Sequence, residues 1–196
     1  MTDAQLQVQL LRPSTDAWLQ CVLDNFNEFL IDHAANERKA SSMALSLVAH
    51  YPDRTDLVME MIDLSLEELN HFRQVMRIIR AKNLVMPPDE KDPYVNQLRT
   101  HLRKGTEHYF LDRLLSAAVI EARGEERFRR IADRLAGQEL QSFYTTIANS
   151  ERGHHILFLQ LAERYFSESI VKSRLEDWLV IEDAVIENLP LRARLH

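Results

Sequence analysis

The stretch LSLEELNHFRQVMRII, residues 64–79, carries the clearest structural pattern in the chain. Its apolar side chains recur at the three- and four-residue spacing of one helix face, and Glu68 shares that face with Leu64 and Val75. The neighbouring Glu67 falls on the opposite, polar face, where a carboxylate is solvated. We therefore predict a long amphipathic helix that directs one carboxylate, Glu68, into the core.

A histidine follows Glu68 by three positions, so the two side chains lie on one helix face and can bind the same cation. The same Glu-x-x-His pair recurs in the second half of the chain, and a lone Glu precedes each pair at nearly the same distance. Two such pairs alone are close to chance in a chain rich in Glu, whereas the repeated register of all six residues is not. The repeat predicts six metal ligands: Glu37, Glu68, His71, Glu121, Glu151 and His154.

All four of these carboxylates fall on apolar helix faces, where an unpaired charge would cost several kcal/mol. Two divalent ions would neutralise them, and mixed nitrogen and oxygen ligands with open positions suit non-haem iron. Small residues beside the carboxylates would leave space for the metal: Ala34, Ala117, Ala118, Ala148 and Gly153. Three further histidines are expected to support the ligands or to lie on the surface: His33, His108 and His155.

Composition points to a single all-α domain over residues 1–196. The chain has 196 residues, of which 45% are hydrophobic, enough for one core, and its four Gly and six Pro leave little turn chemistry for a β fold. Its one cysteine, Cys21, excludes an intramolecular disulfide. A net charge of −6 argues against nucleic-acid binding through bulk charge.

The segments expected to be helical can be placed from caps and prolines. We predict a helix start near Asp16, a second segment capped by Asp32 that runs to Tyr51, and a third from residue 53 or 55 to about 83, followed by a loop at 85–89. A short basic helix should run from Pro93 to Gly105, and long helices should cover 106–136, the residues after Gly137, and 168–189.

Neither a secretory signal nor a membrane span is predicted. The first thirteen residues, MTDAQLQVQLLRP, lack a basic segment followed by an apolar one, and no run approaches the roughly 18 apolar residues of a membrane helix. We expect a cytoplasmic protein with no membrane partner.

Four longer strings around the predicted ligands resemble the MiaE family, bacterial tRNA hydroxylases that act on 2-methylthio-isopentenyl-adenosine. They are FLIDHAANERKAS at 29–41, SLEELNHFRQV at 65–75, AAVIEARGEERF at 117–128 and NSERGHH at 149–155. The Glu-x-x-His pairs are shared by the ferritin-like superfamily, and the longer strings indicate this member of it. The resemblance spans nearly the whole chain.

This resemblance implies a ferritin-like four-helix bundle with additional flanking helices and a non-haem di-iron centre. The centre would use O2 as co-substrate and two external electrons, from a reductase or ferredoxin, to hydroxylate the isopentenyl side chain beside the tRNA anticodon. The six ligands carry over position by position, with Glu68 and Glu151 as bridging carboxylates by analogy with related sites. No catalytic residue beyond the ligands is implied, because the redox metal activates the oxygen.

Basic clusters are candidate contacts to the anticodon loop of the tRNA. The residues predicted to bind substrate are Arg99, Arg103, Lys104, Arg123, Arg127 and Arg130. The alternative is that these cations lie on solvated helix faces and pair with neighbouring acids such as Glu125, Glu126 and Asp133.

Other functions fit the same ligand pattern. A ferritin-like iron-storage or ferroxidase protein uses a similar ligand set, and a di-metal protein that detoxifies peroxide is a further alternative. A helical interaction protein without metal is the least specific possibility. The asymmetric loop in the middle of the chain and the extra helical sequence at both ends favour a discrete enzyme.

Overall fold

The computed structural model describes residues 6–196, so residues 1–5 of the N-terminal stretch used to exclude a secretory signal lie outside it. Across residues 6–196 the chain forms seven helices and no strand, as the composition predicts. None of these helices combines the length and the apolar character needed to cross a membrane.

The helices divide into two compact units. The α2–α3 unit contains residues 20–90 and 191–195, and the α5–α6 unit contains the remaining described residues, 6–19, 91–190 and 196. A short helix, α1 (Asp16–Asp24), spans the boundary between them.

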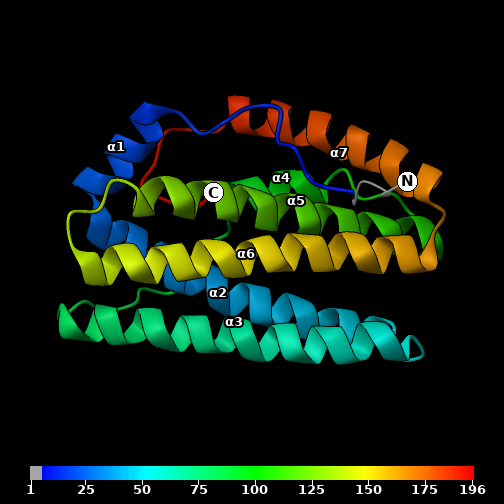
Figure 1. The fold of residues 1–196 in the computed structure, drawn as a ribbon, viewed down its shortest axis with the longest axis horizontal. Coiled ribbons are helices and arrows are strands. Elements are labelled where there is room, and N and C mark those ends of the chain that lie inside the picture. Colours follow the sequence, from blue (N-terminus) through cyan, green and yellow to red (C-terminus); the bar gives the residue numbers. More distant parts are fainter. Residues whose placement is uncertain (1–5) are drawn as a thin grey trace. The chain divides into compact units, whose positions relative to one another are not determined.

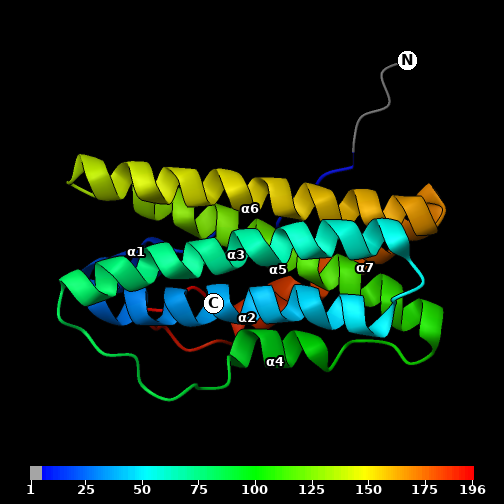
Figure 2. The same cartoon turned by 90° about the horizontal axis from the view of Figure 1, so that it is seen from below.

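The α2–α3 unit is a helical hairpin of α2 (Phe26–His50) and α3 (Thr55–Ala81), which run side by side (Figures 1 and 2). Apolar residues of both helices are fully buried, among them Leu47 and Met61. Hydroxyl groups join the helices at one buried point, where the Oγ of Ser41 donates to the carbonyl oxygen of Ser65 at 2.9 Å. The hairpin therefore combines an apolar interface with a neutral polar contact.

The start of α2 and the end of α3 can be compared with the helix boundaries predicted from the sequence. The cap predicted at Asp32 is wrong, because α2 already begins at Phe26 and Asp32 lies within it. The Asp32 carboxylate instead accepts hydrogen bonds from the backbone N–H of Leu195 at 2.8 Å and from the Arg194 guanidinium at 3.1 Å. At the other end, α3 stops where Asn83 adopts a left-handed conformation, close to the predicted end.

The α5–α6 unit contains four complete helices: α4 (Pro93–Arg99), α5 (Thr106–Ala132), α6 (Gln138–Tyr165) and α7 (Glu168–Glu187). Helices α5 and α6 form the long hairpin of this unit, and α7 packs against α5 (Figure 1). Aromatic side chains fill its core, including Phe128 and Tyr144, whose rings stack with centroids 5.7 Å apart. The predicted start of α5 is confirmed, and its end comes a few residues earlier than expected.

The short helix α4 begins as predicted and ends early. The Asp92 carboxylate caps it by accepting from the backbone N–H groups of Tyr94 and Val95. The helix stops at Arg99 and does not continue to Gly105, because the backbone N–H of Arg103 is bound to the Asp112 carboxylate at 2.8 Å. Gly105 then takes a positive φ of 95°, which its lack of a side chain permits, and α5 begins at the next residue.

Candidate metal centre

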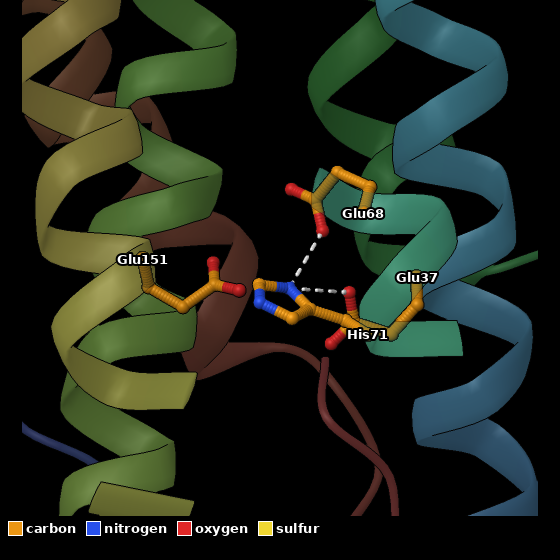
Figure 3. A group of neighbouring side chains, drawn as sticks. All are labelled: Glu37, Glu68, His71 and Glu151. Atoms are coloured by element: carbon orange, nitrogen blue, oxygen red, sulfur yellow. Dashed lines mark hydrogen bonds and ion pairs between the residues drawn. The ribbon is translucent and has the colours of Figure 1, made fainter. Parts of the chain in front are cut away.

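Three predicted ligands come together within the α2–α3 unit. Glu37 projects from α2, and Glu68 and His71 project from successive turns of α3 (Figure 3). All three are at most 5% exposed, and each offers one ligand atom within 4.8 Å of those of the other two. The hairpin thus forms a buried cluster of two carboxylates and one imidazole, here called the first triad.

Hydrogen bonds and ion pairs organise the first triad. The Nδ1 atom of His71 lies 3.4 Å from Oε2 of Glu68 and 3.5 Å from Oε2 of Glu37. One turn before Glu37 on α2, the Nε2 atom of the buried His33 donates to Oε1 of Glu37 at 2.6 Å. Each oxygen of Glu37 therefore faces an imidazole nitrogen.

These contacts shift the ionisation of two ligands. Burial alone would raise the pKa of Glu37, but the hydrogen bonds with His33 and His71 outweigh it and hold that pKa well below its ordinary value. Burial lowers the pKa of His71, and the hydrogen bonds with Glu37 and Glu68 raise it more strongly, to about 10. The ionised carboxylates are stabilised by positive charge between them, which is what a divalent cation supplies.

The other three predicted ligands meet within the α5–α6 unit. Glu121 projects from α5, and Glu151 and His154 project from α6. These side chains are 4–6% exposed, and their ligand atoms also lie within 4.8 Å of one another. The Nδ1 atom of His154 is 3.7 Å from Oε2 of Glu121. This second triad has the same composition as the first, and the predicted burial of all six residues is confirmed.

A glycine makes room for the second triad. A Cβ atom on Gly124 of α5 would lie 2.9 Å from Oε2 of Glu151, closer than side chains tolerate. The sequence had instead suggested Gly153 as a small residue beside the carboxylates, and that prediction is wrong. Gly153 lies on the exposed face of α6, and a Cβ there would meet nothing within 4 Å. Helical spacing identified a small residue near Glu151 but not the one across the hairpin that the carboxylate contacts.

One carboxylate and three histidines were expected to lie outside the ligand set, and the structure places them in different environments. Glu67 is 46% exposed, as its polar helix face predicted, and its Oε1 is 3.8 Å from Nε2 of His71. His155 is buried with its Nδ1 atom 3.4 Å from Oε2 of Glu125, and burial lowers its pKa despite that carboxylate. His108 is exposed. His33 and His155 therefore border the triads, and His108 lies on the surface.

The chemistry of the donors fits a redox-active divalent metal. Each triad offers carboxylate oxygens and one imidazole nitrogen, the mixture found for iron and manganese in bundles of this kind. There is no thiolate among the donors, and Gly124 leaves space at Glu151. The buried carboxylate and histidine clusters are compatible with a di-metal site.

The predicted phosphate contacts separate into two groups. Arg123 and Arg127 are buried within the α5–α6 unit, so the prediction that they contact tRNA is wrong. The Arg123 guanidinium donates to Glu182 of α7 at 2.8 and 3.0 Å, and the Arg127 guanidinium lies over the Trp18 ring, 4.5 Å from its centroid. Burial beside Arg123 lowers the pKa of Arg127 to about 10.

The remaining four cations are more accessible. Arg130 is partly exposed and donates to Asp16 at 2.6 Å. Arg99, Arg103 and Lys104 line a cavity of about 550 Å³ at the junction of α4 and α5. The ion-pair partner of Arg123 could have been identified from the sequence. Glu182 interrupts the apolar face of α7 formed by Leu175, Trp178 and Val185, a pattern that indicates a buried carboxylate in need of a cation.

The chain is similar to tRNA-modifying proteins. Residues 2–196 match the sequence model of the family described as tRNA-(MS[2]IO[6]A)-hydroxylase (MiaE). A Pseudomonas putida protein named tRNA 2-(methylsulfanyl)-N(6)-isopentenyladenosine(37) hydroxylase is 34% identical over 184 residues, which are 94% of this chain and 89% of that protein. A Salmonella typhimurium protein of the same name is 33% identical over 114 residues, which are 58% of this chain and 42% of that protein.

A solved structure also resembles the chain closely. It is "Protein 43 with aldehyde deformylating oxygenase activity" from Synechococcus, with a TM-score of 0.90 and 31% identity over 95% of this chain and 94% of that one. Together with the all-helical architecture of residues 6–196, this likeness confirms the predicted fold class, an all-α, ferritin-like four-helix bundle with flanking helices.

Proposed function

This chain belongs to the MiaE family of tRNA hydroxylases, and we propose that it hydroxylates the isopentenyl side chain of 2-methylthio-isopentenyl-adenosine in tRNA. The observation that carries the proposal is the family match over residues 2–196, which includes both buried triads. The whole chain would act as one catalytic domain. Since its substrate is tRNA, the reaction would take place in the cytoplasm.

The cofactor in this proposal is a pair of iron ions held by the two triads, three ligands from each hairpin. The chemistry that a di-iron centre supplies when bound is activation of O2, which an unactivated C–H bond requires and acid–base side chains alone do not provide. Four carboxylates and two neutral imidazoles balance the charge of two divalent ions. Support for this assignment comes from the matched composition and the burial of the two triads.

The side chains of this protein would hold the ligands in place and keep water out. His33 fixes the orientation of Glu37 through the 2.6 Å hydrogen bond, and Gly124 allows the Glu151 carboxylate to approach α5. Buried ligands with apolar neighbours such as Leu64 and Ile147 limit water at the reacting atoms. These roles need no protein nucleophile.

The reaction also requires an electron donor. One O2, two electrons and two protons convert a C–H bond to C–OH and release one water, so two reducing equivalents must come from outside the chain. We propose a reductase or a ferredoxin as that partner, with the tRNA anticodon loop as the second partner.

The test is reconstitution of the full-length protein with Fe(II) under anaerobic conditions, followed by addition of a chemical reductant, O2 and tRNA that carries the isopentenyl modification. We expect about two iron ions per chain and a gain of one oxygen atom in the modified adenosine, measured by mass spectrometry of digested tRNA. Replacing Glu121 or Glu151 with Ala should abolish iron loading and turnover, whereas Glu67→Ala, a substitution on the polar face, should retain most of both.

Several outcomes would contradict the proposal. Iron and manganese well below one per chain would remove the di-metal centre, and unchanged tRNA with a loaded centre would remove the hydroxylase activity. A large hollow assembly on gel filtration, or O2 release from peroxide, would favour iron storage or peroxide detoxification. Turnover of an aldehyde in place of tRNA would favour the activity named for the Synechococcus protein.

A further inference from the structure

An open cavity lies at the junction of α4 and α5 within the α5–α6 unit. Its volume is about 550 Å³, and it is lined by Arg99, Leu102, Arg103, Lys104, Gly105, Thr106 and Tyr109. Residues 99–109 carry three cations and one carboxylate, Glu107, in a chain whose net charge is −6. Positive charge is therefore concentrated at this cavity against the overall balance of the chain.

Two of the three cations are available to a ligand. Arg99 and Lys104 are exposed, and neither side chain has a hydrogen-bond or ion-pair partner within residues 6–196. Long cationic side chains in that state are mobile and fully hydrated, so a ligand must attract them more strongly than water does. Multiple negative charges at close spacing satisfy that requirement.

The third cation is held in place by a buried carboxylate. Arg103 donates through its backbone N–H and its guanidinium to Asp112, which is fully buried and also accepts from Arg174 of α7 at 2.8 and 2.9 Å. Burial would raise the pKa of Asp112, but the hydrogen bonds with Arg174 and Arg103 lower it overall. The ionised carboxylate thus fixes the backbone that forms the cavity wall.

The beginning of α5 adds donors and an aromatic ring. Gly105 is the N-cap residue of α5 and has no side chain that could accept a hydrogen bond. The backbone N–H groups of the first turn therefore have no capping side chain as acceptor. They add positive potential to that of the cations. Tyr109, on the first turn, is half-buried, and the Arg113 guanidinium lies 5.9 Å from its ring centroid.

We propose that this cavity binds the sugar–phosphate backbone of the substrate RNA, with Arg99 and Lys104 as phosphate contacts and Arg103 as the fixed edge of the site. The inference rests on the proposed function. Thr106 and Glu121 are fifteen residues apart on one helix, a distance of about 22 Å, or roughly six nucleotide steps of a stacked strand. A stem-loop whose reactive nucleotide lies at the triad would therefore place its own stem phosphates at the cavity.

The test measures binding of a fluorescently labelled anticodon stem-loop RNA to the full-length protein by anisotropy at several salt concentrations. We expect Arg99→Ala and Lys104→Ala each to raise the Kd about 5-fold and the double variant about 25-fold. The slope of log K against log salt should become shallower by about 0.7–0.9 for each phosphate-binding cation that is replaced. The matched control is Arg134→Ala, an exposed cation beyond the far end of α5, which should leave both quantities unchanged.

Turnover separates this inference from the proposed function. In an active enzyme the double variant should raise KM for the stem-loop with kcat unchanged, and it should hydroxylate the free nucleoside at the wild-type rate because a nucleoside has no backbone phosphate. A double variant that binds RNA within twofold of wild type overturns the cavity assignment and leaves the hydroxylase proposal intact. RNA binding that weakens as expected in a protein without hydroxylase activity supports the cavity and removes the function.

Discussion

The two long hairpins carry the same ligand pattern on different supports. Both α2–α3 and α5–α6 place one Glu on the first helix and a Glu-x-x-His pair on the second. Four residues before the lone Glu, however, the first hairpin has His33 and the second has Ala117. Three residues after it, the first has Ala40 and the second has Gly124. The two hairpins therefore share their ligand residues but differ at the positions next to them.

The difference shows how each hairpin stabilises buried charge. In the first, an added imidazole supports Glu37, and the helices are joined by the neutral pair of Ser41 and Ser65. In the second, an omitted side chain gives Glu151 its space, and α5 is tied to α7 by the buried ion pair of Arg123 and Glu182. The same metal-ligand residues can thus be held in place by different neighbouring contacts. Each of these contacts can be removed by a separate substitution.

The largest expected effect comes from breaking the charged support. Glu182→Gln removes the fully buried carboxylate partner of Arg123 and leaves only the partly exposed Glu126, 3.1 Å away, so we expect a loss of about 3 kcal/mol in the free energy of unfolding. The corresponding change in the other hairpin, Ser65→Ala, should cost only about 1 kcal/mol because it removes the neutral hydrogen bonds that the Ser65 hydroxyl makes with the hydroxyl and the carbonyl oxygen of Ser41. Urea unfolding measures both.

A neutral contact to the same carboxylate provides a control within the α5–α6 unit. Tyr94 donates its hydroxyl to Glu182 at 3.3 Å, so Tyr94→Phe should cost about 1 kcal/mol. Equal losses for Glu182→Gln and Ser65→Ala would show that the two hairpins do not differ in the way proposed here.

Local patterns in the sequence account for the fold and for the burial of the ligands. The starts of α4, α5 and α7 follow from Asp92-Pro93, Gly105 and the apolar periodicity, and the six ligands are buried because each lies on an apolar stripe. These features depend on residues within one or two helical turns of each other, which is the range over which a single sequence is informative.

Features that depend on distant partners were not predicted. Asp32 resembles a cap, but it binds Arg194 and Leu195, which lie far along the chain. Arg123 resembles a surface cation until its partner on α7 is known. The clearance at Gly124 depends on a side chain of another helix, so no spacing rule within α5 reveals it.

An intermediate effect is expected from removing the added imidazole. His33→Ala should weaken binding of Mn(II) or Fe(II) about 10- to 100-fold, because the hydrogen bond that orients Glu37 is removed. His33→Gln, which retains a donor, should recover part of that loss. The measurement is metal titration of the apoprotein, with the exposed His108→Ala as the control. The second triad has Ala117 at the position that corresponds to His33. Unchanged metal affinity in His33→Ala would therefore mean that the first triad, like the second, binds metal without an imidazole at this position.

The smallest effects are expected from two glycines that differ only in what faces them. Ala is favoured over Gly in a helix interior by up to about 1 kcal/mol, so Gly153→Ala should raise the free energy of unfolding by about 0.5–1 kcal/mol and leave metal affinity unchanged. Gly124→Ala gains the same helix propensity but forces the Glu151 carboxylate to shift, because its Cβ would lie 2.9 Å from Oε2. We expect this variant to show little net change in stability and a metal affinity lower by about 5-fold, or about 1 kcal/mol. Equal metal affinities for the two variants would show that Glu151 adjusts without cost, in which case the second hairpin tolerates the Ala that the first hairpin carries at position 40.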